Sequence, residues 1–305
     1  MNLSIVIPVY NSQNILEELL EQIKINIDFV ENFELILVND CSSDDSWNVI
    51  KRLSSEYTFL KAINLRKNSG QHNAIMAGLN YAKGDTIVMM DDDLQHSPKY
   101  IKELYQNIIN GSDVCYTKFK TKKHKGWKII GSKFNDIVAN LLLKKPKGLY
   151  MSSFKAISKD IKKEIILYDG PYAYIDGLIL STTNNIKTID IKHYNRVDGE
   201  GNYNLWNSIS LWSKMATSFS VLPLRLATFV GFIISIFSFL LGVYFIGLKI
   251  FGDNTLEGWT SLTVIILFLG GIQLISIGII GEYVGRSYLK LNGKKQYFIK
   301  DIIDE

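Results

Sequence analysis

Residues 84–98 read GDTIVMMDDDLQHSP, and the first half of this stretch has the composition of a buried strand. The uncharged run at 86–90 contains β-branched residues, which favours a strand covered on both faces. Asp91, Asp92 and Asp93 follow it directly. Open α/β sheets bind their ligands at the carboxyl ends of their strands. The stretch therefore predicts an acidic ligand site at the edge of a sheet.

The spacing of the three acids indicates a metal site. In extended backbone Asp91 and Asp93 point the same way and can share one hard divalent cation, Mg²⁺ or Mn²⁺, while Asp92 faces elsewhere. The alternative interpretation is a solvated acidic turn, because runs of charge commonly lie on the surface.

Strand-like and helix-like segments alternate on both sides of this stretch. Such alternation predicts an α/β fold with a mostly parallel sheet, right-handed crossovers and one crevice at the carboxyl edge. Apolar runs predict the strands, and apolar residues at helical spacing predict the helices. The expected strands are 3–9, 34–38, 60–65, 86–90, 113–118 and 187–193, and the expected helices are 15–27, 72–82, 98–110, 130–143 and 160–167, with one more around residues 47–53.

Two segments near the C-terminus, 226–248 and 260–281, carry no charged side chain. About 20 apolar residues are enough to cross a bilayer, so both segments are expected to span a membrane. By the positive-inside rule, the basic residues outside the two segments place both outer ends in the cytoplasm. These residues are Lys214 and Arg225 before the first segment, and Arg286, Lys290, Lys294 and Lys295 after the second.

We expect the catalytic part to stay in the cytosol, because the N-terminus has no basic region and its apolar run breaks at Pro8, unlike a signal peptide. The net charge of +4 is small and scattered, so no nucleic-acid partner is expected. An apolar stripe from Leu205 to Phe219 suits a helix in the membrane interface or one packed on the soluble domain. The expected parts are a cytosolic domain at 1–204, an amphipathic helix at 205–222, two transmembrane helices within 223–285 and a cytosolic tail at 286–305.

An acidic metal site beside a membrane suits a reaction between a soluble and a lipid-borne substrate. A divalent metal would bridge a diphosphate and neutralise its charge as it leaves. A nucleotide sugar is a donor with this chemistry.

Five motifs carry a resemblance to a known family: IVIPVYN, LVNDCSSDDS, TIVMMDDDLQHSP, RVDGEGNY and IGIIGEYVGR. Together they resemble the family 2 glycosyltransferases that charge polyprenyl phosphates, a group that includes dolichol-phosphate mannose synthase and bacterial undecaprenyl-phosphate sugar transferases. The resemblance covers nearly the whole chain. It implies a GT-A fold, which is Rossmann-like, and inverting transfer of a sugar from a nucleotide sugar, with uridine as the expected base, to undecaprenyl phosphate. Such a product serves cell-envelope glycans such as lipopolysaccharide.

The resemblance also implies roles for individual residues. Asp40 matches a carboxylate that accepts a hydrogen bond from the base, although it can instead cap a helix, and Asp92 matches a position beside the nucleotide. Asp93 and Arg196 are expected to be catalytic, and Asp91 is expected to bind the nucleotide as well as the metal. The metal-side residues are Asp91, Asp93 and Gln95, and the loop around the nucleoside matches Pro8, Tyr10 and Ser12.

Positive charge is expected around the acceptor phosphate. Arg196 matches a loop arginine of the family, with a surface ion pair as the alternative. Lys118 and Lys133 stand where the family has arginines, which keeps the charge but loses the bidentate fork. Ser152 and Ser153 replace an aspartate that some relatives have as a base. The acceptor phosphate, with a second pKa of about 6, is largely ionised without one.

Three other functions remain as alternatives. A processive polysaccharide synthase normally has a Gln-any-any-Arg-Trp motif and more spans, and the sequence has neither. A non-catalytic membrane scaffold would not need to retain Asp91, Asp93, Gln95 and Arg196 together. A transporter would need more than two spans in one chain. The family suggests a homo-oligomer, and a separate flippase is a possible partner.

Overall fold

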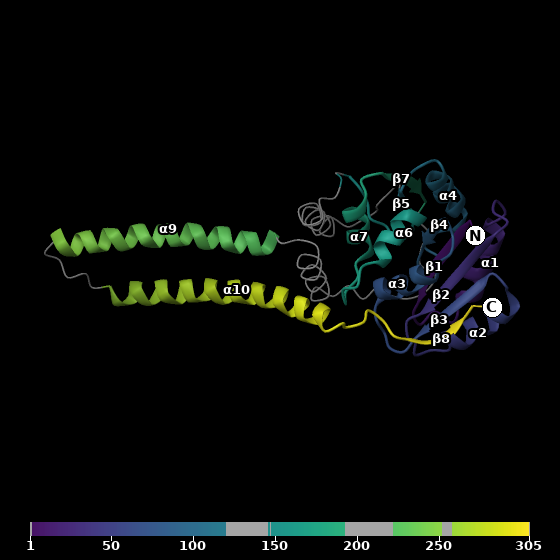
Figure 1. Ribbon diagram of the computed structural model, residues 1–305, viewed down its shortest axis with the longest axis horizontal. Helices are drawn as coiled ribbons and strands as arrows, with labels where there is room; N and C mark the ends of the chain where they lie inside the picture. The colour runs from purple at the N-terminus through teal and green to yellow at the C-terminus, as the bar shows by residue number, and fades with distance from the viewer. Residues whose placement is uncertain (1, 120–145, 147, 193–221, 252–257, 305) are drawn as a thin grey trace. The chain divides into compact units, whose positions relative to one another are not determined.

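The computed structural model describes residues 2–119, 146, 148–192, 222–251 and 258–304. Its described residues belong to two compact units (Figure 1). One unit lies within Met1–Asn204 together with Gly293–Glu305, and the other lies within Leu205–Asn292. The expected helix at 130–143, the amphipathic stretch at 205–221, Lys133 and Arg196 lie outside the described residues.

The first unit is built on one mixed sheet with the strand order β7-β5-β6-β4-β1-β2-β3-β8. Strands β4, β1, β2 and β3 are parallel to one another, and β5 is parallel to β7, whereas β6 and β8 pair antiparallel with their neighbours. This arrangement confirms the expected α/β fold with a mostly parallel sheet. The strands are β1 (Leu3–Val9), β2 (Phe33–Asn39), β3 (Leu60–Leu65), β4 (Thr86–Met89), β5 (Val114–Phe119), β6 (Lys155–Ser158), β7 (Ile186–Ile191) and β8 (Ile299–Ile303).

Helices cover both faces of the sheet, because the central strands are apolar on both sides. Strand β1 is fully buried along its whole length. Leu3, Ile5 and Ile7 belong to the cluster that includes α1, α2 and α4, whereas Val6 faces Gly78 of α3 on the other side. The helices are α1 (Leu16–Asn26), α2 (Ser46–Glu56), α3 (Gln71–Tyr81), α4 (Ile101–Ile109), α6 (Lys159–Ile166) and α7 (Ile175–Thr182), and Pro98–Tyr100 is a short 3-10 helix before α4.

Three elements of this unit have no counterpart in the sequence analysis. Strand β6 is only four residues long and contains a buried lysine, Lys155, so its composition does not indicate a strand. Helix α7 is short, and its first turn contains the buried acid Asp176. Residues 286–305 were treated as a tail, but Ile299–Ile303 forms β8 on β3. Pairing with a distant strand, rather than local composition, creates β6 and β8.

The second unit contains two long helices, α9 (Leu222–Phe251) and α10 (Trp259–Leu291), which lie side by side as an antiparallel pair (Figure 1). The windows Leu224–Leu241 and Phe268–Leu291 have mean hydropathies of 2.1 and 1.4, and none of their residues is buried. The core helix of a soluble protein would bury such a face. Both helices are therefore long and apolar enough to cross a membrane.

We predict that Gly84→Ala destabilises the first unit. A Cβ atom on Gly84 would lie 2.5 Å from the backbone nitrogen of Ser4, and backbone in a central strand cannot move aside cheaply. Overpacking of this kind costs about 1–3 kcal/mol. The check is the free energy of unfolding in detergent. Gly111→Ala is the comparison variant. A Cβ atom there would have no neighbour within 4 Å, but the backbone has a positive φ of 92°, so this variant tests backbone strain and not packing. Unchanged stability in Gly84→Ala would contradict the packing described.

Candidate functional site

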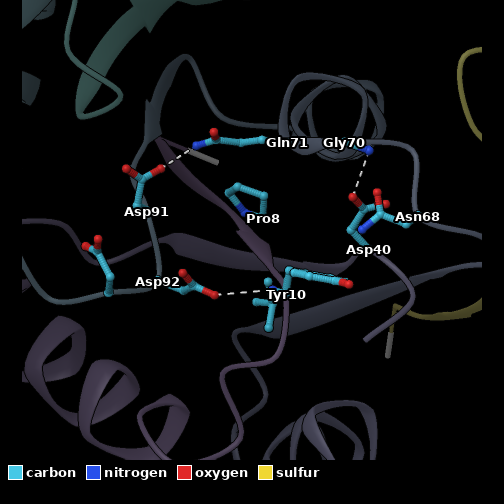
Figure 2. A pocket seen from close by; sticks show the side chains of 10 residues that line it. Pro8, Tyr10, Asp40, Asn68, Gly70, Gln71, Asp91 and Asp92 are labelled. Atoms are coloured by element: carbon cyan, nitrogen blue, oxygen red, sulfur yellow. Dashed lines mark hydrogen bonds between the residues drawn. The ribbon is translucent and has the colours of Figure 1, made fainter. Parts of the chain in front are cut away.

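The carboxyl ends of β1, β2 and β4 meet at one edge of the sheet and surround a cavity of about 340 Å³ (Figure 2). Val6 pairs with Met89 and Val9 pairs with Asn39, so the residues that follow β4 lie level with the end of β1. The register therefore brings distant parts of the chain together. The cavity is lined by Pro8, Val9, Tyr10, Asp40, Asn68, Gly70, Gln71, Asp91, Asp92 and Asp93.

Asp91 is held at this edge by two neutral donors. Gln71 Nε2 donates to Asp91 Oδ1 at 2.6 Å, and Ser153 Oγ donates to Oδ2 at 2.5 Å. Figure 2 shows Asp91 pointing toward Gln71 across the cavity. Burial raises the pKa of Asp91, the Ser153 hydrogen bond opposes this change, and the nearby charge of Asp93 adds to it. The side chain is thus fixed in direction, but its negative charge is held at an energetic cost.

Asp92 accepts two hydrogen bonds from the loop between β1 and α1. Its Oδ2 accepts from Ser12 Oγ at 2.5 Å and from the Tyr10 backbone nitrogen at 3.3 Å. Burial raises the pKa of Asp92 to about 6, although these two hydrogen bonds lower it. Asp92 thus contacts Tyr10 and Ser12, two of the residues expected in the loop around the nucleoside. It does face away from Asp91, toward Tyr10 (Figure 2).

The backbone turns sharply after Asp93. Leu94 has a φ of 56°, in the left-handed region that a leucine rarely adopts. The backbone nitrogen of Gln95 donates to Asp93 Oδ1 at 3.1 Å. Residues 91–95 therefore form a bend rather than the extended segment assumed from the sequence, yet Asp91 and Asp93 both line the same cavity.

Asp40 follows β2 and lies opposite the acidic stretch. Its Oδ1 accepts from the backbone nitrogen of Ser69 at 2.7 Å, and its Oδ2 accepts from that of Gly70 at 2.8 Å. Asp40 therefore binds the backbone just before α3, a segment remote from it in sequence. Burial raises its pKa, and the two backbone hydrogen bonds lower it. Each carboxylate oxygen keeps a second lone pair for a ligand.

A second cavity of about 470 Å³ lies on the other side of Tyr10 and shares Asp92 and Asp93 with the first. Its walls come from the loop after β1 and the loop after β2. The lining residues are Tyr10, Asn11, Ser12, Gln13, Asn14, Ile15, Ser43, Asp44, Asp92 and Asp93.

The donor set fits a hard divalent cation. Asp91 and Asp93 supply carboxylate oxygens to one cavity, and their mutual repulsion contributes to the raised pKa of Asp91. A cation between them would relieve that repulsion. Within the described residues, no group of three His, Cys, Asp or Glu side chains could hold a metal. Two carboxylates leave coordination positions for oxygens of a bound ligand.

The residues expected around the acceptor phosphate are Lys118, Lys133 and Arg196. Lys118 is exposed near the end of β5, and β6 separates that strand from β4. Because β5 and β4 run in the same direction, Lys118 lies at the carboxyl edge too. Arg196 and Lys133 lie outside the described residues. The sequence analysis missed the contacts of Gln71 and Ser153 with Asp91, because these donors come from α3 and from the residues just before β6, both distant in sequence.

Lys155, Asp176 and Tyr116 form a buried polar cluster close to Asp91. Lys155 pairs with Asp176, and their side chains are only 3% and 10% exposed. The hydroxyl of Tyr116 also donates to Asp176 Oδ1, at 2.8 Å. The cluster joins β5 and β6 to the start of α7. It thereby fixes β6, whose preceding residues include Ser153.

We predict that Asp176→Ala costs about 3–5 kcal/mol of unfolding free energy, because it leaves the Lys155 ammonium buried without its partner. The double variant Lys155→Met, Asp176→Leu should recover most of this loss. Chemical denaturation in detergent measures both. Asp160→Ala removes an exposed ion pair with Lys163 and should change stability little. Equal losses in the single and double variants would contradict the buried-pair description.

Comparisons with known proteins identify the family. Residues 4–166 match the family model described as glycosyl transferase family 2. The chain is 32% identical over 308 residues to an undecaprenyl-phosphate 4-deoxy-4-formamido-L-arabinose transferase of Shewanella sediminis, covering 98% of this chain and 92% of the relative. It is 28% identical to a prophage bactoprenol glucosyl transferase homolog of Escherichia coli, covering 99% of each.

Among solved structures, glucosyl-3-phosphoglycerate synthase from Mycobacterium tuberculosis in complex with Mn²⁺ and uridine-diphosphate-glucose is similar in fold. The TM-score is 0.52 at 17% identity, over 71% of this chain and 77% of that one. The family model spans more than half of the sequence, and the acidic stretch after β4 lies inside it. The chain belongs to glycosyltransferase family 2.

Proposed function

We propose that this glycosyltransferase moves a sugar from a uridine-diphosphate sugar to undecaprenyl phosphate, with inversion at the anomeric carbon. The observation that carries the proposal is an acidic cavity at the end of β4 in the same chain as two unburied apolar helices. Such a chain can bring a soluble donor to a lipid-borne acceptor. The names of the Shewanella sediminis and Escherichia coli relatives support this acceptor.

The donor nucleotide fits the cavity between β1 and α3. The ring of Tyr10 lines this cavity and is 52% exposed, which makes it a platform on which a base can stack. Asp40 lies in the same cavity, and its free lone pairs can accept a hydrogen bond from a base N–H. Uracil has such a group at its pairing edge. The uridine-diphosphate-glucose in the Mycobacterium tuberculosis neighbour supports this choice of base.

Asp91 and Asp93 would hold Mg²⁺ or Mn²⁺ in the cavity, whereas Gln95, the third expected metal-side residue, is not among the residues that line it. When bound, the cation supplies charge stabilisation to the leaving diphosphate. Gln71 and Ser153 keep the Asp91 carboxylate in one orientation, so no reorganisation is needed as the leaving charge develops. The Mn²⁺ in the Mycobacterium tuberculosis neighbour supports this role of the acids.

The acceptor phosphate needs cationic side chains that do not belong to the metal. Lys118, Lys133 and Arg196 would bind it and reduce its repulsion from the donor diphosphate. Its ionised oxygen then attacks the anomeric carbon, the bond from that carbon to the diphosphate breaks, and the nucleoside diphosphate leaves with the electron pair. The chain's main contribution is alignment of the two substrates.

The membrane arrangement follows from the same reasoning. We infer that α9 and α10 both span the bacterial inner membrane, with the catalytic domain and both termini in the cytoplasm. In that arrangement the phosphate of undecaprenyl phosphate lies at the same surface as the cytosolic donor. Assembly into a homo-oligomer, and delivery of the product to a separate flippase, are further parts of this proposal.

Asp93→Ala should lower transfer by about a hundredfold or more, because one of two metal-side carboxylates is lost. The assay incubates purified protein, Mn²⁺ or Mg²⁺, a panel of nucleotide sugars and undecaprenyl phosphate, and detects the glycosylated lipid by mass spectrometry. Asp28→Ala, an exposed acid outside the cavity, serves as the control. Robust turnover by Asp93→Ala would contradict the metal role, and no lipid product from the wild type would overturn the proposed reaction.

Arg196→Ala should raise the KM for undecaprenyl phosphate about tenfold, since a charge-assisted hydrogen bond to phosphate is lost. The KM for the nucleotide sugar should stay the same. Steady-state kinetics with each substrate varied in turn separates the two effects. Arg52→Ala, which removes exposed ion pairs with Glu17 and Glu56, is the control. A change confined to the donor KM would reverse the assignment of Arg196.

A further inference from the structure

A row of polar side chains crosses the sheet from β8 to the loop after β1. Asn64 Nδ2 donates to Asp301 Oδ2 at 3.0 Å, and Asn64 Oδ1 accepts from Asn39 Nδ2 at 2.8 Å. Asn39 Oδ1 in turn accepts from Ser42 Oγ at 2.6 Å. Finally, Ser42 Oγ accepts from the backbone nitrogen of Asn11 at 3.0 Å. We call these five residues the polar row.

The polar row follows the register of the sheet. Asn39 pairs with Asn64 across β2 and β3, and Asn64 pairs with Asp301 across β3 and β8, where the register then shifts. Cross-strand partners project from the same face, so their side chains can meet. Asn39 is 2% exposed and Asn64 is 5% exposed. Both amides therefore depend on each other for hydrogen bonding, because buried polar groups are costly when unpaired.

Every donor in the polar row points toward the Asp301 carboxylate. Each amide or hydroxyl uses its hydrogen toward β8 and its oxygen toward the loops after β1 and β2. Hydrogen bonds arranged in one direction polarise one another and strengthen the chain as a whole. The carboxylate of Asp301 is thus the final acceptor of a chain of hydrogen bonds that begins at the backbone nitrogen of Asn11.

The loop end of the polar row carries backbone strain. Asn11 has a φ of 54° and Cys41 has a φ of 58°, both in the left-handed region. Such conformations persist where surrounding contacts hold them. Asn11 Oδ1 also accepts from the Ser43 backbone nitrogen at 2.8 Å, so the loop after β1 is hydrogen-bonded to the loop after β2. These loops carry Tyr10 and Asp40, which line the first cavity.

We propose that the polar row positions the nucleotide-sugar site, and that β8, the strand that follows α10 in sequence, is thereby part of the donor-binding machinery. The identity of the ligand rests on the proposed function. The effect of the polar row on the loops after β1 and β2 does not depend on it. Asn64 and Asn39 act through the loops and do not touch the donor. Asp301 anchors the far end of the polar row.

The test compares two buried polar residues in one protein. Asn64→Ala leaves Asn39 Nδ2 buried without an acceptor, whereas Ser4→Ala removes a buried hydroxyl that bonds Glu34 and Gly84 at the opposite end of the sheet. Calorimetric titration of full-length protein in detergent with UDP and Mn²⁺ should show affinity roughly three- to tenfold weaker in Asn64→Ala, the range for one lost hydrogen bond. Ser4→Ala should bind as the wild type does.

Hydrogen–deuterium exchange supplies a readout that needs no ligand. Asn64→Ala should speed exchange in residues 10–13 and 41–46, and Ser4→Ala should not. Equal effects of the two variants on these loops, or no effect of Asn64→Ala, would overturn the proposal. If the wild type does not bind UDP with Mn²⁺, the proposed donor is wrong, while the exchange data still decide whether the polar row positions the loops.

A second pair of variants tests the contribution of β8. Asp301→Ala should change loop exchange and UDP affinity in the same direction as Asn64→Ala, and Asp301→Asn, which keeps an acceptor oxygen, should restore much of the loss. Asp304→Ala is the matched control, because Asp304 lies just beyond β8 and pairs with Lys61 and Lys83 instead. If Asp304→Ala has the same effect as Asp301→Ala, the polar row is not what connects β8 to the donor site.

Discussion

The carboxylates of Asp91 and Asp92 are held in place by neutral donors. Gln71 and Ser153 bond Asp91, and Ser12 and the Tyr10 backbone bond Asp92. Among the described residues, no ion pair involves either acid. Their direction is therefore fixed by neutral groups, and burial raises the pKa of both carboxyls. Under the proposed function, such a site would suit a divalent cation and the diphosphate of the donor.

The sheet makes this arrangement possible by mixing strand directions. Parallel β1, β2 and β4 bring three loop ends to one edge. The antiparallel β6 then lies beside β4, so that the chain entering β6 carries Ser153 to Asp91. Burial of the Lys155–Asp176 pair ties β6 to α7 and keeps this donor in position. Stability and chemistry are connected here, because the same strand contributes to the core and to the acid's orientation.

The chain returns to the sheet after its two long apolar helices. Strand β8 covers the edge of β3, where unpaired backbone groups would otherwise be exposed. Its carboxylate ends a row of buried amides that reaches the loops around the first cavity. Strand β8 is thus connected to the loops after β1 and β2 by hydrogen bonds within one unit.

The sequence by itself determined the parallel strands, the two apolar helices and the acidic stretch after β4, because each depends on local composition and spacing. Because parallel strands end at the same edge of a sheet, the sequence also predicted that Pro8, Tyr10, Asp40 and Asp91 lie together. Tertiary structure alone decided that Asp40 binds the backbone before α3, that Gln71 and Ser153 hold Asp91, and that β6 and β8 are strands. These features depend on partners 20 to more than 200 residues away, as in Asn64 with Asp301, and no local pattern encodes such pairings.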